Sequence, residues 1–285
     1  MRSLRRIAVG YDASSRGRDA LVLAELLART AGADLLAVRV ERHADADATA
    51  RLEAELADAL PPTSVRAGAL ALARRSVGKS LAQMVERETE IGMLSIGSTH
   101  RAGRGRVMAG VVAERLLEGA RCSIAVAPDG FAAEPRAPGA QPPAEKLRVI
   151  GVAFDGSAEA AGALTTATAL ARNADATLRV ITAGPHGAGA PSEALENVGR
   201  RSAAQLQQAL HEAVAELPAE LRALPIYEQG VAAQVVLERA DEGVDLLIMG
   251  SRGYGPPDSV LVGSTSRAVI GAAPCPVVVV PRPAI

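Results

Sequence analysis

An internal repeat constrains this chain most, because a duplicated segment of about 140 residues is long enough to fold as a domain. The segment IAVGYDASSRGRDAL at residues 7–21 recurs as IGVAFDGSAEAAGAL at residues 150–164, an offset of 143. Two later segments, MLSIGSTH at 93–100 and ARCSIAVAP at 120–128, have counterparts 153 residues further on. The comparison places the ten extra residues of the second copy in a Gly- and Pro-rich stretch around 184–192.

The repeat predicts two domains, 1–129 and 147–285, joined by a Pro- and Ala-rich linker at 130–146. The net charge is −1 overall, +3 in the first domain and −4 in the second, so we expect no nucleic-acid partner. Apolar runs fall short of the ~18–20 residues of a membrane span. Two cysteines among 285 residues are too few for a secreted disulfide scaffold. We therefore expect a cytoplasmic protein without a membrane partner.

Short apolar runs alternate with longer stretches of helical spacing in both copies. Runs without polar alternation are typical of parallel strands that are buried on both faces. They lie at 7–9, 35–40, 93–96 and 123–127, and again at 149–154, 177–182, 246–249 and 277–280. The alternation predicts an α/β fold of two tandem doubly wound parallel sheets, with ligands bound at the carboxyl ends of the strands.

The glycine pattern after the fourth strand of the second copy carries the main functional signal. The stretch GSRGYGPPDSVLVGST follows Met249 and leads into a helix. The first two glycines would let the backbone approach a ligand, and the final Gly-Ser-Thr would open a helix whose N–H groups favour a phosphate. The residues concerned are Gly250, Arg252, Gly253, Gly263, Ser264 and Thr265. A flexible loop with an ordinary helix cap is the alternative, which the strand before and the helix after disfavour.

This G-x2-G-x9-G-[ST] pattern, with an Asp after the first strand, resembles the universal stress protein family, and the resemblance extends to both halves. It implies two five-stranded domains of the adenine nucleotide alpha hydrolase-like fold. In nucleotide-binding members the Asp region and the end of the second strand hold adenine and ribose, and the glycine loop holds phosphates. Carried over, the nucleotide-binding residues are Asp155, Ser157, Val180, Met249, Gly250, Arg252, Gly253, Gly263, Ser264 and Thr265. The implied cofactor is ATP, with or without Mg²⁺, although AMP or a cyclic nucleotide stays open.

The family's terminal strand makes its dimer contact, so the resemblance implies that runs 124–127 and 277–280 pair within this chain as a pseudo-dimer. A homodimer in addition is left open.

The first copy departs from the pattern. It keeps a weaker set of candidate nucleotide-binding residues at the matching positions, namely Asp12, Ser14, Val38, Gly97 and Gly110. His100 replaces the second glycine, and Val111 replaces the Ser or Thr. Both changes weaken a phosphate cradle, whereas the arginines at 101, 104 and 106 make the loop basic. Anion binding through charge and a solvated loop on a degenerate site are both open.

No catalytic or metal-binding constellation is recognisable. The match to the relaxed P-loop pattern, ARRSVGKS at 73–80, lies mid-domain and is not repeated in the second copy, which indicates an accidental match. The leading hypothesis is therefore a stress-response or regulatory protein that binds ATP mainly in its second domain with little or no catalysis. The alternatives are a slow ATP hydrolase or transferase that uses Asp155, and an interaction scaffold without nucleotide.

Overall fold

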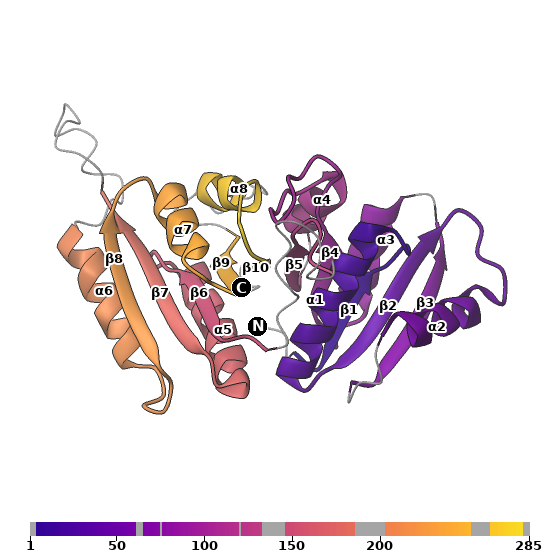
Figure 1. The fold of residues 1–285 in the computed structure, drawn as a ribbon, viewed down its shortest axis with the longest axis horizontal. Helices are drawn as coiled ribbons and strands as arrows, with labels where there is room; N and C mark the ends of the chain where they lie inside the picture. The colour runs from indigo at the N-terminus through magenta and orange to yellow at the C-terminus, as the bar shows by residue number, and fades with distance from the viewer. Residues whose placement is uncertain are drawn as a thin grey trace.

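A single ten-stranded sheet runs through the whole protein (Figure 1). The computed structural model describes residues 4–60, 65–74, 76–119, 121–132, 146–185, 203–251 and 263–281. The strand order is β3-β2-β1-β4-β5-β10-β9-β6-β7-β8. The strands are β1 (Arg6–Gly10), β2 (Asp34–Glu41), β3 (Ala67–Ala73), β4 (Ile91–Gly97), β5 (Ser123–Ala127), β6 (Val149–Ala153), β7 (Thr177–Gly184), β8 (Ala223–Gln229), β9 (Leu246–Gly250) and β10 (Val277–Val280).

Helices cover both faces of the sheet, and two buried clusters fill the space beneath them. One cluster lies under α1, α2, α5 and α6, and the other under α3, α4, α7 and α8. The helices are α1 (Ser15–Ala31), α2 (Ala48–Ala59), α3 (Val77–Arg87), α4 (Val111–Gly119), α5 (Ala158–Ala174), α6 (Ala203–Ala215), α7 (Ala232–Asp241) and α8 (Ser264–Ile270).

The eight apolar runs of the sequence all fall on strands, which confirms the tandem α/β fold. Within each half the strand pairs are parallel, and all five residues of β5 are buried, as expected for a strand covered on both faces. Each half has one more strand that no apolar run marked, β3 in the first half and β8 in the second. Both lie at the outer edges of the sheet, and neither carries a continuous buried run.

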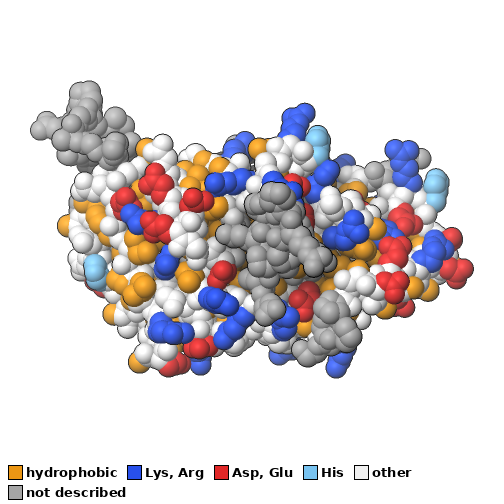
Figure 2. All heavy atoms as spheres, in the orientation of Figure 1, with side chains coloured by type: hydrophobic (Ala, Val, Ile, Leu, Met, Phe, Trp, Pro, Cys, Tyr) orange, Lys and Arg blue, Asp and Glu red, His pale blue; other side chains and the backbone are white. Residues whose placement is uncertain are grey.

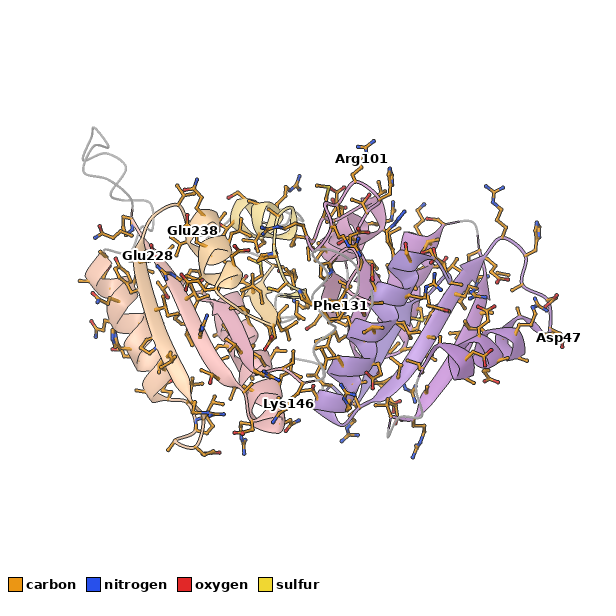
Figure 3. All side chains as sticks on the ribbon, in the orientation of Figure 1. Asp47, Arg101, Phe131, Lys146, Glu228 and Glu238 are labelled. Carbon is orange, nitrogen blue, oxygen red and sulfur yellow. The ribbon has the colours of Figure 1, made fainter. Side chains whose placement is uncertain are left out.

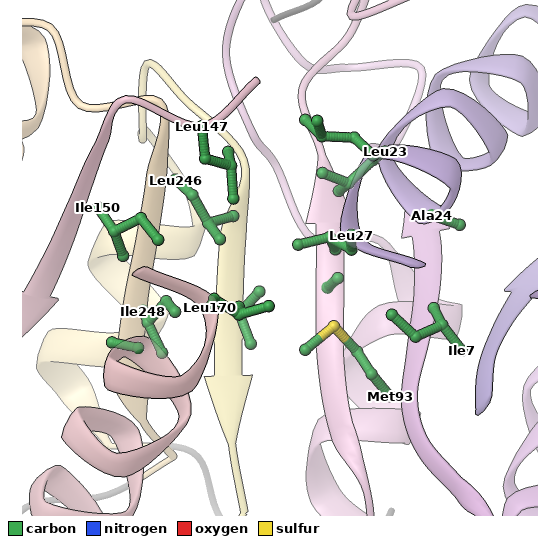
Figure 4. Packing of buried hydrophobic residues seen from close by; sticks show 14 of the residues in the cluster. Ile7, Leu23, Ala24, Leu27, Met93, Leu147, Ile150, Leu170, Leu246 and Ile248 are labelled. Carbon is green, nitrogen blue, oxygen red and sulfur yellow. The ribbon is translucent and has the colours of Figure 1, made fainter. Parts of the chain in front are cut away.

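The two halves join through their terminal strands. β5 and β10 pair antiparallel, with Val126 opposite Val277 and Ile124 opposite Val279. This pairing confirms the intramolecular pseudo-dimer and gives each terminal strand a partner on both sides. One buried cluster crosses the seam and contains both Leu27 of α1 and Leu170 of α5 (Figure 4).

The cysteines occupy equivalent places just before the terminal strands. Cys122 and Cys275 are both buried as free thiols. Burial raises the pKa of the Cys275 thiol to about 12, so this side chain acts as apolar filling at neutral pH.

Asp19 of α1 fixes the chain where it leaves the first half. Its buried carboxylate accepts hydrogen bonds from the backbone N–H groups of Gly130 (2.9 Å) and Ala132 (2.7 Å). Burial raises the pKa of this carboxyl group. Residues 133–145, most of the predicted linker, lie outside the described residues, as does much of the expected insertion around 184–192.

Basic and acidic side chains are interspersed over the face of the molecule shown in Figure 2. Among the helices in the described ranges, none is long and apolar enough to cross a membrane.

Candidate functional site

A cavity of about 480 Å³ opens at the carboxyl ends of β1, β2 and β4. This volume lies within the ~300–1,000 Å³ of small-molecule pockets. All five site residues predicted for the first half line it, from four separate segments: Asp12, Ser14, Val38, Gly97 and Gly110. The starts of α1, α3 and α4 complete the walls.

A tight turn after β1 fixes the acidic residue of this cavity. The Ser14 N–H and hydroxyl donate to Asp12 Oδ1 at 3.1 and 2.6 Å, while the Ser14 hydroxyl oxygen accepts from Gly17 N at 3.0 Å and caps α1. The turn requires a left-handed residue between them, and Ala13 occupies that place with φ 60°. A non-glycine residue in this region is strained, which is common at functional sites.

The second half builds the same turn. Ser157 N donates to Asp155 Oδ1 at 2.9 Å, and the Ser157 hydroxyl oxygen caps α5 by accepting from Ala160 N at 3.2 Å. Gly156 takes the left-handed position with φ 74°. Asp155 and Ser157 therefore stand where Asp12 and Ser14 stand in the first half.

Val180, which the sequence analysis matched to Val38 as a nucleotide-binding residue, lies on the opposite face of the sheet from Val38. Val38 lies opposite Gly10, and the same register in the second half puts Ile181 opposite Ala153. Ile181 shares its buried cluster with Val38 and Met249, whereas Val180 belongs to the cluster under α5 and α6. A shift of one residue along a strand reverses the face, so Ile181 takes the place expected for Val180. The repeat offset of 143 from Val38 points to Ile181 directly.

The first glycine of each pattern is required by helix packing. A Cβ on Gly97 would lie 2.4 Å from the carbonyl oxygen of Arg16, and one on Gly250 would lie 2.8 Å from Cβ of Glu159. Arg16 and Glu159 are equivalent positions at the starts of α1 and α5. These glycines therefore let the helix approach the strand, whatever ligand is bound.

The glycine loop of the second half is closed at its ends. Gly263 N donates to the Ser251 carbonyl oxygen, and the Ser266 hydroxyl donates to the Gly250 carbonyl oxygen, both at 2.9 Å. These bonds hold the end of β9 beside the start of α8, where Ser264 and Thr265 lie. The predicted Arg252 and Gly253 lie outside the described residues.

Known proteins match this chain over its whole length and over each half. The model of the Universal stress protein family matches residues 146–281. A universal stress protein of Thermus aquaticus is 37% identical over 138 residues, which cover 98% of that protein and 47% of this chain. The chain belongs to the universal stress protein family. A member from Mycobacterium tuberculosis is 28% identical over 303 residues, covering 96% of this chain and 99% of that protein.

A solved structure supports the tandem fold. The universal stress protein of Archaeoglobus fulgidus superimposes with a TM-score of 0.67 at 17% identity, covering 98% of this chain and 99% of that one. The two-domain arrangement of this universal stress protein therefore has a counterpart of nearly the same length.

Tyr11 and its neighbours were missed by sequence reasoning. Tyr11 lines the cavity, and the Arg39 guanidinium lies 5.4 Å from its ring centroid. Arg39 is held by Glu55 of α2, with Nη1 at 2.8 Å from Oε1 and Nη2 bonded to Oε2. Burial, and then the Glu55 charge, raise the pKa of Tyr11. Tyr11, Arg39 and Glu55 come from three separate segments of the chain. In the sequence, only the position of the aromatic Tyr11 beside Asp12 could have indicated this cluster.

The described part of the P-loop-like segment leads directly into α3 of this universal stress protein. Gly78, Lys79 and Ser80 lie inside α3, and the Ser80 hydroxyl donates to the Ser76 carbonyl oxygen at 2.7 Å. Gly78 packs against Arg115 of α4. The interpretation of the match as accidental agrees with this placement. Within the described ranges, no three His, Cys, Asp or Glu residues gather as a metal site.

Proposed function

We propose that this universal stress protein binds an adenine nucleotide at the carboxyl edge of its sheet, with ATP held mainly in the second domain. The observation that carries the proposal is the closed glycine loop, because two hydrogen bonds bring Gly250 beside the start of α8. Gly263–Thr265 then present a helix start at the carboxyl end of β9, the strand that pairs with β6, and β6 leads to Asp155 and its turn.

The first-domain cavity supports the proposed placement of the adenine and ribose. It is hollow at the same strand ends, and it is lined by Asp12, Ser14 and Val38, the counterparts of Asp155, Ser157 and Ile181. An adenine and ribose would lie between this turn and the second strand. The repeat extends the same placement to the second domain.

The proposed role is binding with little or no catalysis. Asp155 accepts a hydrogen bond from the turn, as Asp12 does, and this pattern suits a carboxylate that orients a ribose. A hydrolase or transferase that uses Asp155 predicts release of ADP that disappears in Asp155→Asn. We expect wild type and Asp155→Asn to release ADP at the same background rate, and faster release by wild type would overturn this part of the proposal.

Isothermal titration of the full chain with ATP tests the binding. Ser264→Asp places a carboxylate at the first position of α8, where it stabilises the helix but repels a phosphate. Val111→Asp is its matched control, at the same repeat position at the start of α4. We expect Ser264→Asp to weaken ATP binding at least tenfold, about 1.4 kcal/mol. We expect Val111→Asp to leave ATP binding in the second domain unchanged.

ATP binding by Ser264→Asp as tight as in wild type would overturn the assignment. Acid extraction of the purified protein followed by mass spectrometry separates binding from a scaffold role. We expect adenine nucleotide in the extract.

A further inference from the structure

The first-domain cavity keeps its nucleoside end, but its other end has a different chemistry. His100 lines it where the family pattern has glycine. Val111 and Val77 stand at the starts of α4 and α3 and are 81% and 43% exposed. They are two of the four large hydrophobic side chains that are exposed in the described part of the chain, and both line this cavity. Val111 therefore puts an apolar side chain where the family pattern has a hydroxyl donor.

The backbone of the first-domain loop is committed to the protein. A phosphate cradle needs N–H groups that point at the ligand. In this loop seven N–H groups donate to protein oxygens instead: those of Ser98, Thr99, Ala102, Gly105, Arg106, Val107 and Met108. The Val107 N–H bonds the Ala273 carbonyl oxygen of the second domain at 2.8 Å. These groups cannot turn to a polyphosphate without breaking the loop.

The arginines of the loop are also directed elsewhere. Arg101 extends away from the body of the protein (Figure 3). Arg104 packs beside Gly130, and Arg106 bonds the Ala272 carbonyl oxygen at 3.3 Å and pairs with Asp241 at 3.4 Å. The basic side chains that line the cavity are Arg16 and His100.

We propose that the first-domain cavity binds a nucleoside monophosphate and discriminates against the triphosphate. Two basic side chains suit one phosphate, whereas a triphosphate would place its further charges beside Val111 and a loop in which seven N–H groups already bond protein oxygens. The inference rests on the proposed adenine-nucleotide function and assigns the two domains different ligands. The second domain takes ATP, and the first takes AMP.

Titration of the full chain with AMP and with ATP, each on the Ser264→Asp background, tests this division. On this background the second site is weakened, and the binding that His100→Asp removes is that of the first domain. We expect AMP to bind at least tenfold more tightly than ATP. Equal affinities, or tighter ATP binding, would overturn the inference while leaving the second-domain assignment intact, since that assignment is judged by the loss of ATP binding between wild type and Ser264→Asp.

A matched pair of loop variants locates the site. His100→Asp introduces a negative charge at a side chain that lines the cavity, and Arg101→Asp makes a larger charge change on a neighbour that points away. Both positions are exposed, so the fold should tolerate either variant. On the same background we expect His100→Asp to weaken AMP binding about tenfold and Arg101→Asp to change it less than threefold. Equal effects would mean that only the general charge of the loop matters, and would refute the assignment.

Discussion

Replacing Gly97 by Ala tests whether the first glycine of the pattern serves the fold or the ligand. A Cβ at this position would lie 2.4 Å from the Arg16 carbonyl oxygen and 2.9 Å from its carbon. Real Cβ atoms stay at least 3.0 Å from such neighbours. The backbone at the start of α1 must therefore retreat by about 0.6 Å, in a packed interior that transmits strain.

The magnitude follows from two opposing effects. Overpacking of this kind destabilises by about 1–3 kcal/mol. Loss of glycine's freedom in the unfolded chain offsets about 0.4–1 kcal/mol. We expect a net loss of about 1–2 kcal/mol from the stability of the first domain, without any nucleotide present.

Gly103→Ala is the matched control in the same region. Nothing lies within 4 Å of a Cβ there, so only the unfolded-state effect remains and the variant should be neutral or slightly more stable. Calorimetric unfolding of the full chain measures both variants, and each kcal/mol should move the midpoint by roughly 2–8 °C. Gly97→Ala with wild-type stability but weakened nucleotide binding would refute the packing argument and return the glycine to a ligand role.

Four further substitutions test the local geometry. Ala13→Gly should stabilise by up to about 1 kcal/mol in denaturant titration, because it relieves a left-handed alanine, and Gly156→Ala should destabilise by about 1–2 kcal/mol. Arg39 lowers the folded-state pKa of Glu55, so the pair stabilises above the unfolded value near 4.5 and less as pH falls through the lower folded value. Glu55→Gln should therefore lose about 0.5 kcal/mol of stability at pH 7, and this loss should disappear as the pH falls through the lowered folded-state pKa of Glu55. Asp19→Ala should expose residues 130–132 to faster hydrogen exchange.

The central strands could be predicted because both their faces are buried. β10 is a continuous apolar run, and Ser95 is the one polar residue of β4. Such runs indicate a buried strand even when the neighbouring strands are unknown. The outer strands could not be predicted in this way. β3 is AGALALA with residues of intermediate exposure, and β8 contains Pro225, so neither shows the signal of a doubly covered strand.

The site could be predicted where residue identity determines backbone geometry. The turns around Asp12 and Asp155 and the glycine beside Arg16 follow from the chain itself. Val180 was misplaced by one residue, and a strand reverses face at every residue. The repeat offset from Val38 leads to Ile181, and the pairing of Ile181 with Ala153 fixes that register. The direction of Arg106 likewise depends on its contacts with Ala272 and Asp241 of the other half.

The two loops diverged at the place where the halves meet. In the first half, Val107 is fully buried and bonds the chain just after α8, and Arg106 reaches the end of α7. A loop held in this way serves as a connector between domains, and its N–H groups are no longer available to a phosphate chain. Loss of the second glycine and of the hydroxyl at Val111 then carries no penalty for docking. The same contacts place the first-domain loop against the residues that follow α8, whose first turn carries Ser264.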